Sequence, residues 1–287
     1  MIKINKKSMR LANMSDIFQQ VDKELLLLQP SYPFTEVTAG FTTKHGGMSS
    51  GAFATFNLGL HVGDDRAVVV RNRQRLADLL QFPLERWICC EQIHGARIEK
   101  VKASQNGRGA ADYSSAIAGT DGLYTDEAGV LIALCFADCV PLYFIAPKHG
   151  MIGLAHAGWK GTVKNIAGEM VRLWQEREHI PLADIYVAIG PSIGACCYVV
   201  DDRVIVHVDR VLQGEQPLPY RQVSPGQYAL DLKALNQMLL MKAGIRKDHI
   251  YVSSYCTSCA DHLFFSHRRD QGKTGRMMAF IGRKEEK

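Results

Sequence analysis

Three short segments of the chain each place a side chain of metal-ligand type beside a turn. They are Gln92-Ile93-His94-Gly95, Ala137-Asp138-Cys139-Val140-Pro141 and His156-Ala157-Gly158-Trp159. Imidazole and thiolate are donors that zinc prefers, and three protein ligands leave a fourth coordination position open for chemistry. The spacing from His94 to Cys139 to His156 is wider than in zinc fingers or ribbons, so spacing alone indicates a metal only weakly. In the alternative interpretation, Cys139 is a small core residue and the two histidines are structural.

The remaining cysteines form patterns that have two interpretations. Cys256-Thr257-Ser258-Cys259 is a CxxC motif, which occurs both in zinc sites and in redox pairs. The sequence has no second CxxC to complete a four-cysteine site, so we expect two thiols in a packed loop. Cys196-Cys197 and Cys89-Cys90 are adjacent pairs, and adjacent side chains of a strand point to opposite faces. We expect both pairs to lie in the core.

A basic loop with several glycines precedes the last apolar run of the chain. It contains Arg268 and Arg269 within the segment 266–276. Because the planar guanidinium binds phosphate or carboxylate through two hydrogen bonds, this pair is a candidate anion site. Lys44, in the glycine-rich segment 44–49, is a second candidate, although the segment lacks the ending and the following helix of a Walker A loop. A solvated hairpin loop is the alternative for Arg268 and Arg269, and Lys44 has the same ambiguity.

Three apolar runs surround two of the candidate metal ligands. They are Val130–Phe136, Val140–Ile145 and Met151–His156. The gaps between them are too short for parallel crossovers, so the runs are predicted to pair as an antiparallel meander. An up-down-up path places Cys139 and His156 on the same rim of the sheet, where their side chains can converge.

The other predicted elements are strands and helices distributed along the whole chain. We expect strands at Gly40–Thr43, Trp87–Gln92, Arg97–Val101, Ile185–Ile189, Ile250–Ser253 and Met277–Ile281. We expect helices at Val68–Leu80, Gly158–Arg177, Asp202–Leu212 and Asp231–Lys242. His94 then falls in a tight turn between two strands. In the first helix, the polar residues predicted to face water are Asn72, Arg73, Arg75 and Asp78. Because strands outnumber helices and hairpins dominate, the predicted fold class is α+β, with mixed or antiparallel β-sheets flanked by helices.

Composition restricts the classes of protein to which the chain can belong. A net charge of +5 over 287 residues, with no dense stripe of basic and aromatic residues, argues against a nucleic-acid partner. No apolar run is long enough to span a bilayer and no signal peptide is recognisable, so we expect no membrane partner and a cytoplasmic protein. The eight cysteines are then free thiols or metal ligands rather than disulfides. Without a repeat or linker, residues 15–287 are predicted to form a single domain, preceded by a frayed extension at residues 1–14.

Together these motifs resemble the YfiH/YlmD family, from about Gly40 to the C-terminus. The matching segments are Gly40-Phe41-Thr42-Thr43, Asn57-Leu58-Gly59, Asn72-Arg73, Gln92-Ile93-His94-Gly95, Thr120-Asp121-Gly122, Ala137-Asp138-Cys139-Val140-Pro141, His156-Ala157-Gly158-Trp159-Lys160-Gly161, Gly190-Pro191-Ser192-Ile193, Cys256-Thr257, Phe264-Phe265-Ser266 and Arg268-Arg269. The family is variously described as laccase-like multicopper polyphenol oxidoreductase, peptidoglycan editing factor and purine nucleoside phosphorylase. Its usual pattern has arginine at the position of Lys44 and an aromatic residue at the position of His267, so an anion contact at Lys44 is less strongly indicated.

The resemblance implies a four-layer α/β/β/α fold and one Zn²⁺ ion bound by His94, Cys139 and His156. It implies phosphorolysis of adenosine, inosine and methylthioadenosine, together with deamination of adenosine. A purine nucleoside and phosphate are then the partners of the protein, which we expect to be a monomer. Asp138 is a candidate proton shuttle beside Cys139, or else it stabilises its own turn. The candidate contacts to nucleoside or phosphate are Lys44, Asn57, Gln92, Arg268 and Arg269.

Three other functions remain open from the sequence. Cys139 as nucleophile, with His94 or His156 as base, would make a cysteine hydrolase or amidase acting on peptidoglycan precursors. Copper-dependent oxidation of polyphenols is disfavoured because the ten histidines include no His-x-His pair. A non-catalytic zinc-binding or metabolite-sensing module would keep the same ligands without turnover.

Overall fold

The described part of the chain contains two large β-sheets. The computed structural model describes residues 16–29, 31 and 33–285, so the extension expected at residues 1–14 lies outside it. The first sheet has the strand order β1 (Phe18–Gln20), β2 (Leu25–Leu28), β3 (Thr38–Thr42), β15 (Met277–Arg283), β7 (Val130–Phe136), β4 (Trp87–Ile88). The second has the order β14 (Ile250–Val252), β10 (Tyr186–Ile189), β8 (Val140–Ala146), β9 (Met151–Ala157), β6 (Gly122–Thr125), β5 (Ile98–Lys100).

The two sheets pack against each other through apolar side chains that alternate along each strand. In β7, the even-numbered residues Val130, Ile132, Leu134 and Phe136 lie in a cluster shared with Tyr143, Ile145, Ile152 and Leu154 of β8 and β9. The odd-numbered residues Leu131, Ala133 and Cys135 lie in a different cluster on the outer face. Because both faces of these strands are buried, they read as continuous apolar runs in the sequence.

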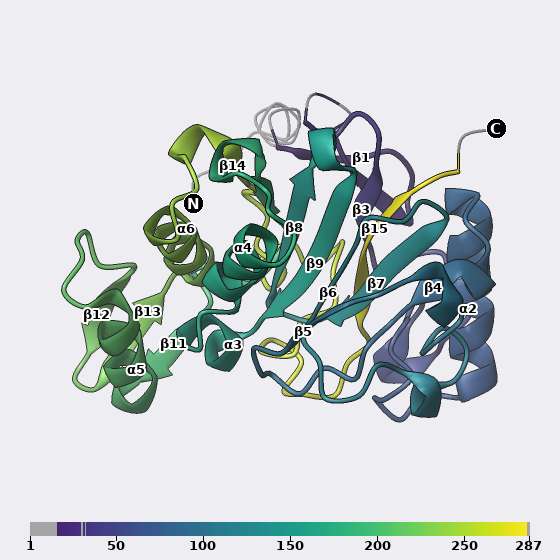
Figure 1. Ribbon diagram of the computed structural model, residues 1–287. Helices are drawn as coiled ribbons and strands as arrows, with labels where there is room; N and C mark the ends of the chain where they lie inside the picture. The colour runs from purple at the N-terminus through teal and green to yellow at the C-terminus, as the bar shows by residue number, and fades with distance from the viewer. Residues whose placement is uncertain (1–15, 30, 32, 286–287) are drawn as a thin grey trace.

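Helices cover the two outer faces of this pair of sheets. Helix α2 (Arg66–Leu80) lies against the first sheet, whereas α4 (Ile166–Glu176) and α6 (Leu232–Lys242) lie against the second (Figure 1). The short helix α3 (Trp159–Val163) and helix α5 (Asp202–Leu212) continue the second helical layer. A small sheet of β11 (Val199–Asp201), β13 (Gln227–Leu230) and β12 (Tyr220–Ser224) lies beside α5. The α+β class and the four-layer α/β/β/α arrangement are thus confirmed.

The predicted three-stranded meander is wrong in one respect. Strands β8 and β9 form an antiparallel hairpin, with Pro141 opposite His156. Strand β7, however, belongs to the other sheet, where it pairs with β15 and β4. The chain therefore crosses from one sheet to the other between Phe136 and Val140. The apolar pattern of β7 does not distinguish these arrangements, because each of them buries both faces of the strand.

The strands expected around His94 do not form a hairpin either. Strand β4 pairs in parallel with β7 in the first sheet, and β5 pairs in parallel with β6 in the second. Both strands are shorter than predicted, and the segment between them is a second crossover from sheet to sheet. A short connection usually signals a hairpin, but here it bridges two stacked layers.

The predicted helix over Gly158–Arg177 is interrupted. Helix α3 ends at Val163, and Asn165 adopts a left-handed conformation with φ 60°. The Asn165 side chain accepts a hydrogen bond from the backbone N–H of Gly168, so it caps the N-terminus of α4. The interruption turns the chain between the pocket-facing helix α3 and the sheet-covering helix α4.

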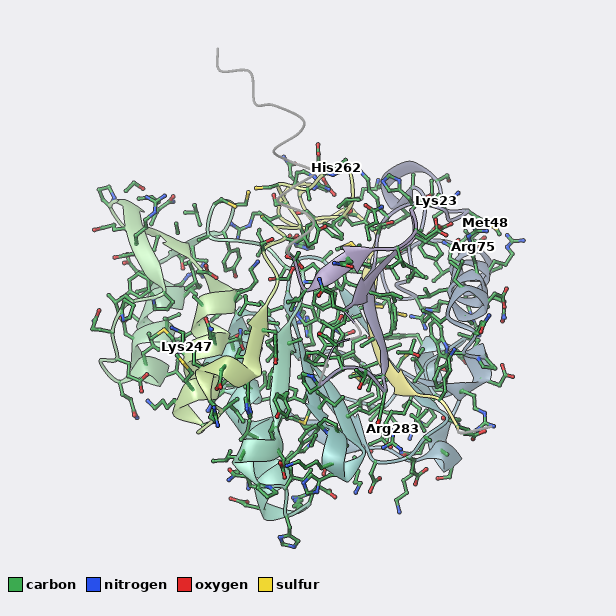
Figure 2. All side chains as sticks on the ribbon, turned by 90° about the horizontal axis from the view of Figure 1, so that it is seen from above. Lys23, Met48, Arg75, Lys247, His262 and Arg283 are labelled. Carbon is green, nitrogen blue, oxygen red and sulfur yellow. The ribbon has the colours of Figure 1, made fainter. Side chains whose placement is uncertain are left out.

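Two polar residues of α2 that were predicted to face water are buried. Asn72 accepts a hydrogen bond from the backbone N–H of Met48 at 2.8 Å, and Arg73 donates to three backbone carbonyls at 2.7–2.8 Å. Arg75 forms an ion pair with buried Glu24 at 2.6 Å, and Figure 2 shows Arg75 near Met48 at one corner of the molecule. These side chains hold irregular loops onto the helix, a role that helical periodicity does not reveal.

No helix within residues 16–29, 31 and 33–285 has both the length and the apolar character needed to cross a membrane.

Candidate metal and substrate site

His94, Cys139 and His156 converge at one end of the two packed sheets. Their ligand atoms all lie within 4.8 Å of one another. The rings of His94 and His156 are nearly perpendicular, with centroids 4.8 Å apart. His156 is buried, Cys139 is partly buried and His94 is exposed, so the group is open to solvent on one side.

Strand directions explain why three distant residues meet. Because β4 and β7 are parallel, both leave the first sheet at the same end. In the second sheet, β8 and β6 both run antiparallel to β9, and β5 is parallel to β6. Strands β5 and β8 therefore begin at the same end of this sheet. The two crossovers therefore lie side by side, one carrying His94 and the other Cys139. His156, at the end of β9, reaches the same rim.

Asp121 fixes both the backbone around His94 and the ring of His156. This buried carboxylate accepts hydrogen bonds from the N–H groups of Ile93 at 3.2 Å, His94 at 2.9 Å and Gly95 at 2.6 Å. It also contacts Nδ1 of His156 at 2.9 Å. An ionised carboxylate can only accept, so Nδ1 of His156 carries a proton, and Nε2 is the nitrogen that would bind a metal ion after losing its own proton. Asp121 belongs to the segment Thr120-Asp121-Gly122, but no role was predicted for it.

The charges of this group favour a deprotonated sulfur. Desolvation raises the pKa of Cys139, but the charge of His156 and hydrogen bonds from both histidines outweigh it and lower the pKa to about 6. Burial lowers the pKa of His156, but the Cys139 sulfur and Asp121 outweigh it and raise the pKa to about 9. Burial likewise opposes ionisation of Asp121, whose pKa is nevertheless lowered by its hydrogen bonds. A thiolate is the form of cysteine that binds metals and attacks electrophiles.

Gly158 leaves the space that the three ligands need. A Cβ atom at this position would lie 2.9 Å from Sγ of Cys139 and 3.0 Å from Cδ2 of His94. A Cβ atom at Gly161 would lie 2.8 Å from the carbonyl oxygen of Gly95. The two glycines that follow His156 therefore allow α3 to pass close to the ligand group.

The three side chains line a cavity of about 480 Å³. This volume is within the range of small-molecule sites. The other lining residues include three cations, two aromatic side chains and two further histidines. The complete lining is His61, Gln92, His94, Cys135, Ala137, Asp138, Cys139, His156, Trp159, Lys160, Ile193, Tyr198, Leu232, His267, Arg268 and Arg276.

A larger groove of about 800 Å³ lies on the helical layer and shares Trp159 and Lys160 with this cavity. It contains none of the three candidate metal ligands, so the smaller cavity is the candidate active site.

Of the predicted substrate and catalytic residues, Gln92, Asp138 and Arg268 line the cavity. The side-chain amide of Gln92 donates from Nε2 to the carbonyl of Cys135 and accepts at Oε1 from the backbone N–H of Cys135, at 2.8 Å each. The carboxylate of Asp138 accepts from Oγ1 of Thr257 at 2.6 Å, Oγ of Ser266 at 2.9 Å and the backbone N–H of Arg268 at 2.8 Å. Asp138 thus holds the loop 257–268 against the cavity rather than stabilising its own turn.

Lys44, Asn57 and Arg269 do not line the cavity. Asn57 is buried, and its side chain contacts Asp64 and the backbone N–H of Arg276. The guanidinium of Arg269 is bonded to Asp270 and to backbone carbonyls of its own loop region. The pair of adjacent arginines is therefore divided, with Arg268 facing the cavity and Arg269 stabilising the loop.

Several cavity residues were not predicted as site residues. Arg276 ends the basic loop that drew attention to Arg268, and His61 follows the Asn57-Leu58-Gly59 motif. Tyr198 supports Arg268, whose guanidinium carbon lies 4.7 Å from the centre of the ring. Lys160 follows Trp159 at the start of α3. Their proximity to these motifs was the available signal, but a loop sequence does not show which side chains turn inward.

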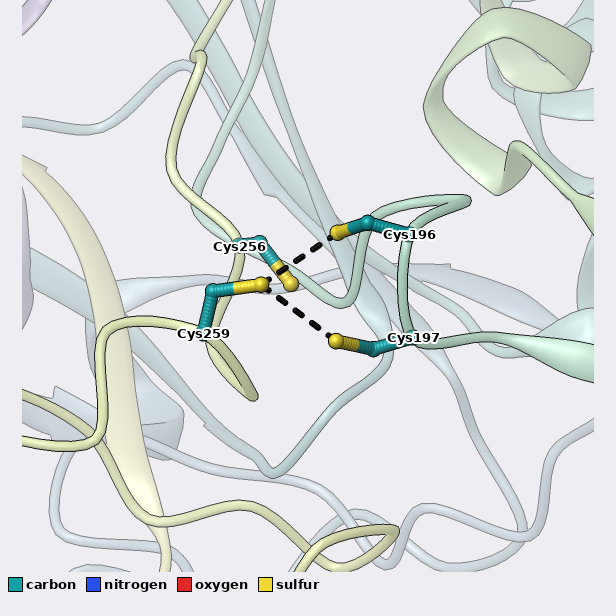
Figure 3. Close-up of side chains that lie close together, drawn as sticks. All are labelled: Cys196, Cys197, Cys256 and Cys259. Atoms are coloured by element: carbon teal, nitrogen blue, oxygen red, sulfur yellow. Dashed lines mark hydrogen bonds between the residues drawn. The ribbon is translucent and has the colours of Figure 1, made fainter. Parts of the chain in front are cut away.

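The predictions for the remaining cysteines are confirmed for one pair and wrong for the other. Cys89 and Cys90 are buried in different apolar clusters, as adjacent residues of an extended segment should be. Cys196 and Cys197 instead occupy a turn, and both lie close to Cys256 and Cys259 (Figure 3). A turn lets adjacent side chains point the same way, so the core prediction fails for this pair. The two thiols of the CxxC motif lie in a loop, as expected, with Cys256 partly buried and Cys259 exposed.

The layers and the ligand group together define a class of protein: an α/β/β/α sandwich with a His–Cys–His group at one end. Comparison with known sequences then identifies the family of this chain. The chain belongs to the family described as multi-copper polyphenol oxidoreductase laccase, whose profile matches residues 38–284.

Close relatives include proteins that carry one of the family descriptions given above, purine nucleoside phosphorylase. The chain is 64% identical over 273 residues to a Geobacillus stearothermophilus protein named purine nucleoside phosphorylase YlmD, covering 95% of this chain and 99% of that one. It is 52% identical over 250 residues to a Bacillus subtilis protein of the same name, covering 87% and 90%.

Solved structures agree with these sequence matches. The crystal structure of YlmD from Geobacillus stearothermophilus matches with a TM-score of 0.93 at 64% identity, over 94% of this chain and 100% of that one. A Bacillus licheniformis hypothetical protein YfiH matches with a TM-score of 0.88 at 47% identity, over 93% and 99%. The resemblance to the YfiH/YlmD family is confirmed.

Proposed function

We propose that the protein is a zinc-dependent purine nucleoside phosphorylase acting on adenosine, inosine and methylthioadenosine. One observation carries the proposal: two histidines and a cysteine converge in a cavity large enough for a nucleoside and lined by three cations. The relatives named purine nucleoside phosphorylase support the choice of reaction.

The donor set fits a zinc ion. Zinc sites with three protein ligands keep one position open, and zinc-binding histidines usually donate their second nitrogen to a carboxylate. His156 has this arrangement, because Asp121 accepts from Nδ1 and leaves Nε2 facing Cys139 and His94. Gly158 provides the space beside the ligands. When bound, zinc would act as a Lewis acid towards an atom of the substrate in the open position.

The remaining lining residues suit a nucleoside and an anion. Phosphorolysis requires phosphate to be held beside the anomeric carbon of the ribose. Arg268, Arg276 and Lys160 are the cations that face the cavity, and guanidinium groups bind phosphate through paired hydrogen bonds. We assign phosphate binding to Arg268 and Arg276 in place of Lys44 and Arg269. Tyr198 and Trp159 offer aromatic surfaces for the purine.

Deamination of adenosine at the same centre is the second part of the proposal. This reaction needs a group that transfers a proton between the attacking water and the leaving amine. Asp138 is the candidate, but three donors already hold its carboxylate. We therefore expect D138N to impair both reactions through the displaced loop, whereas a proton shuttle would lose deamination alone.

The test compares metal-loaded and chelator-treated protein with adenosine or inosine plus phosphate. The expected products are ribose 1-phosphate with adenine or hypoxanthine, and inosine from deamination. H156A should lose both reactions, whereas H149A should retain them, because His149 lies at the opposite end of β8 and β9. Full phosphorolysis by zinc-free H156A protein contradicts the proposal.

A cysteine hydrolase or amidase is the second candidate, and the lowered pKa of Cys139 favours it. An activated thiolate beside an imidazole is the arrangement of a nucleophilic cysteine. The two functions differ in how Cys139 reacts with iodoacetamide. Protection of Cys139 by stoichiometric zinc supports the phosphorylase, whereas rapid alkylation of the active, metal-replete protein supports the hydrolase.

Copper-dependent oxidation is not proposed for this chain. Multicopper oxidation needs several histidine-rich groups that bind copper ions together. Within the described residues, only two groups of metal-ligand side chains are found, and one of them contains no histidine.

A further inference from the structure

Four cysteines from two distant loops meet away from the His–Cys–His group. Cys196 and Cys197 lie in the loop between β10 and β11, and Cys256 and Cys259 lie in the loop between β14 and β15. Sγ of Cys259 lies 3.3 Å from Sγ of Cys196 and 3.3 Å from Sγ of Cys197 (Figure 3). All four sulfur atoms lie within 4.8 Å of one another.

These distances match a metal site better than a pair of disulfides. A tetrahedral zinc ion with Zn–S bonds of about 2.3 Å separates its sulfur ligands by roughly 3.8 Å. Two of the Sγ–Sγ distances are 3.3 Å and none exceeds 4.8 Å, which is compatible with this value. A disulfide requires about 2.05 Å between two sulfurs. In addition, each of Cys196 and Cys197 approaches the same partner, Cys259, which could pair covalently with only one of them.

The surroundings of the four sulfurs suit a negatively charged complex. The backbone N–H of Gly194 donates to Sγ of Cys256 at 3.2 Å, which stabilises a thiolate. The buried ammonium group of Lys233 donates to the carbonyls of Ser253 and Tyr255 in the same loop. Four thiolates around a divalent ion carry a net charge of −2, for which a buried cation nearby is a suitable counter-charge.

We propose that Cys196, Cys197, Cys256 and Cys259 bind a structural Zn²⁺ ion. Sulfur is the donor type that selects zinc over the harder divalent cations. Four protein ligands fill the tetrahedral shell and leave no position for substrate, so this ion does not act on the substrate directly. The motif escapes a search for paired CxxC sequences because one half of the site is an adjacent Cys-Cys pair in a turn.

The proposed ion joins the two loops that form one wall of the cavity. The loops already contact each other, because the backbone N–H of Thr257 donates to the carbonyl of Ser192 at 3.1 Å. The first loop ends at Tyr198 and the second carries Arg268, which packs on the Tyr198 ring. Both loops lack regular secondary structure, so a metal crosslink is a direct way to hold these two side chains in place.

Metal content of purified variants tests the proposal. Wild-type protein, H156A, C256S/C259S and C90A are purified with a thiol reductant, supplied with zinc, desalted and measured by elemental analysis. We expect C256S/C259S to contain one zinc ion fewer per chain than wild type. C90A is the matched control, since Cys90 is a buried free cysteine that belongs to neither group of metal-ligand side chains, and should match wild type. Equal zinc content in C256S/C259S and wild type overturns the proposal.

This design tests the two proposed metal sites independently of each other. If the His–Cys–His group holds no zinc, H156A matches wild type, but the loss in C256S/C259S is still observed. The exposed residue Cys259 also allows the single variant C259S, which provides the same comparison if the double variant does not fold.

Cobalt identifies the ligands themselves. Apo H156A loaded with Co²⁺ should show the strong visible bands of a tetrahedral tetrathiolate complex, and C259S in the same background should lose them. Mass spectrometry of alkylated protein under non-reducing conditions detects the alternative, in which the four cysteines form disulfides. The site is refuted if protein purified without reductant contains disulfides that join these four cysteines and if the reduced protein shows no sulfur-dependent cobalt bands.

Discussion

The buried carboxylate of Asp121 provides the sharpest test of the candidate metal centre. Four N–H groups contact it, two on each oxygen: those of His94 and His156 on one, and those of Ile93 and Gly95 on the other. In D121N, the amide nitrogen replaces one of the two oxygens. In either orientation, two donors then face another donor. At about 1–3 kcal/mol for each unsatisfied buried group, the expected loss of folding stability is roughly 2–6 kcal/mol.

The same substitution should weaken zinc binding. Loss of a carboxylate that orients a ligand histidine typically reduces metal affinity by about 10–100-fold. Zinc affinity is measured by competition with a chromophoric chelator on the folded fraction, and stability is measured by urea denaturation of chelated protein. D184N is the matched control, because Asp184 contacts His149 in a similar carboxylate–imidazole pair at the other end of the sheet. Unchanged zinc affinity in D121N, together with unchanged stability, would refute the assigned role of Asp121.

Three further predictions concern the space, the anion contacts and the buried cation. G158A retains an allowed backbone conformation, but its Cβ would crowd the Cys139 sulfur. Zinc affinity, measured by chelator competition, should therefore fall, while the melting temperature, measured by calorimetry, stays close to that of wild type. R268Q should raise KM for phosphate about 10-fold or more, with KM for inosine unchanged, because a charged hydrogen bond contributes roughly 1.5–3 kcal/mol; an equal rise in both constants contradicts phosphate binding. R73M leaves three carbonyls without a donor and should cost about 3 kcal/mol or more in urea denaturation, whereas R71M, on the exposed face of the same helix, should stay within about 0.5 kcal/mol.

Local sequence signals predicted helix α5 and the positions of most strands, because each depends on residues close together in the chain. They also placed Cys139 and His156 on one rim, and this prediction is confirmed for the hairpin of β8 and β9. Sheet membership could not be predicted in the same way. The apolar run of β7 is compatible with either sheet, and long-range pairing with β15 decides between them.

The candidate site shows a similar division between local and long-range information. The ligand types of His94, Cys139 and His156 were recognisable from their motifs. The partners that orient the site were not, because Asp121 is separated from His156 by 35 positions and Cys196 from Cys259 by 63. A hydrogen bond across such a separation leaves no periodicity in the sequence. The inward turn of Arg268 and the outward turn of Arg269 likewise depend on which carbonyls the loop offers.

The position of two candidate ligands in one sheet has a consequence for how a bound metal ion would be lost. His156 belongs to a central strand, and Cys139 directly precedes another strand of the same sheet. Neither residue can leave the centre through the opening of a peripheral loop. Release of a bound metal ion by separation of these two ligands should therefore be coupled to cooperative opening of the sheet, and the slow opening reported by amide exchange in β8 and β9 should set the upper limit for its rate. The fold would then be the kinetic barrier that retains a bound ion.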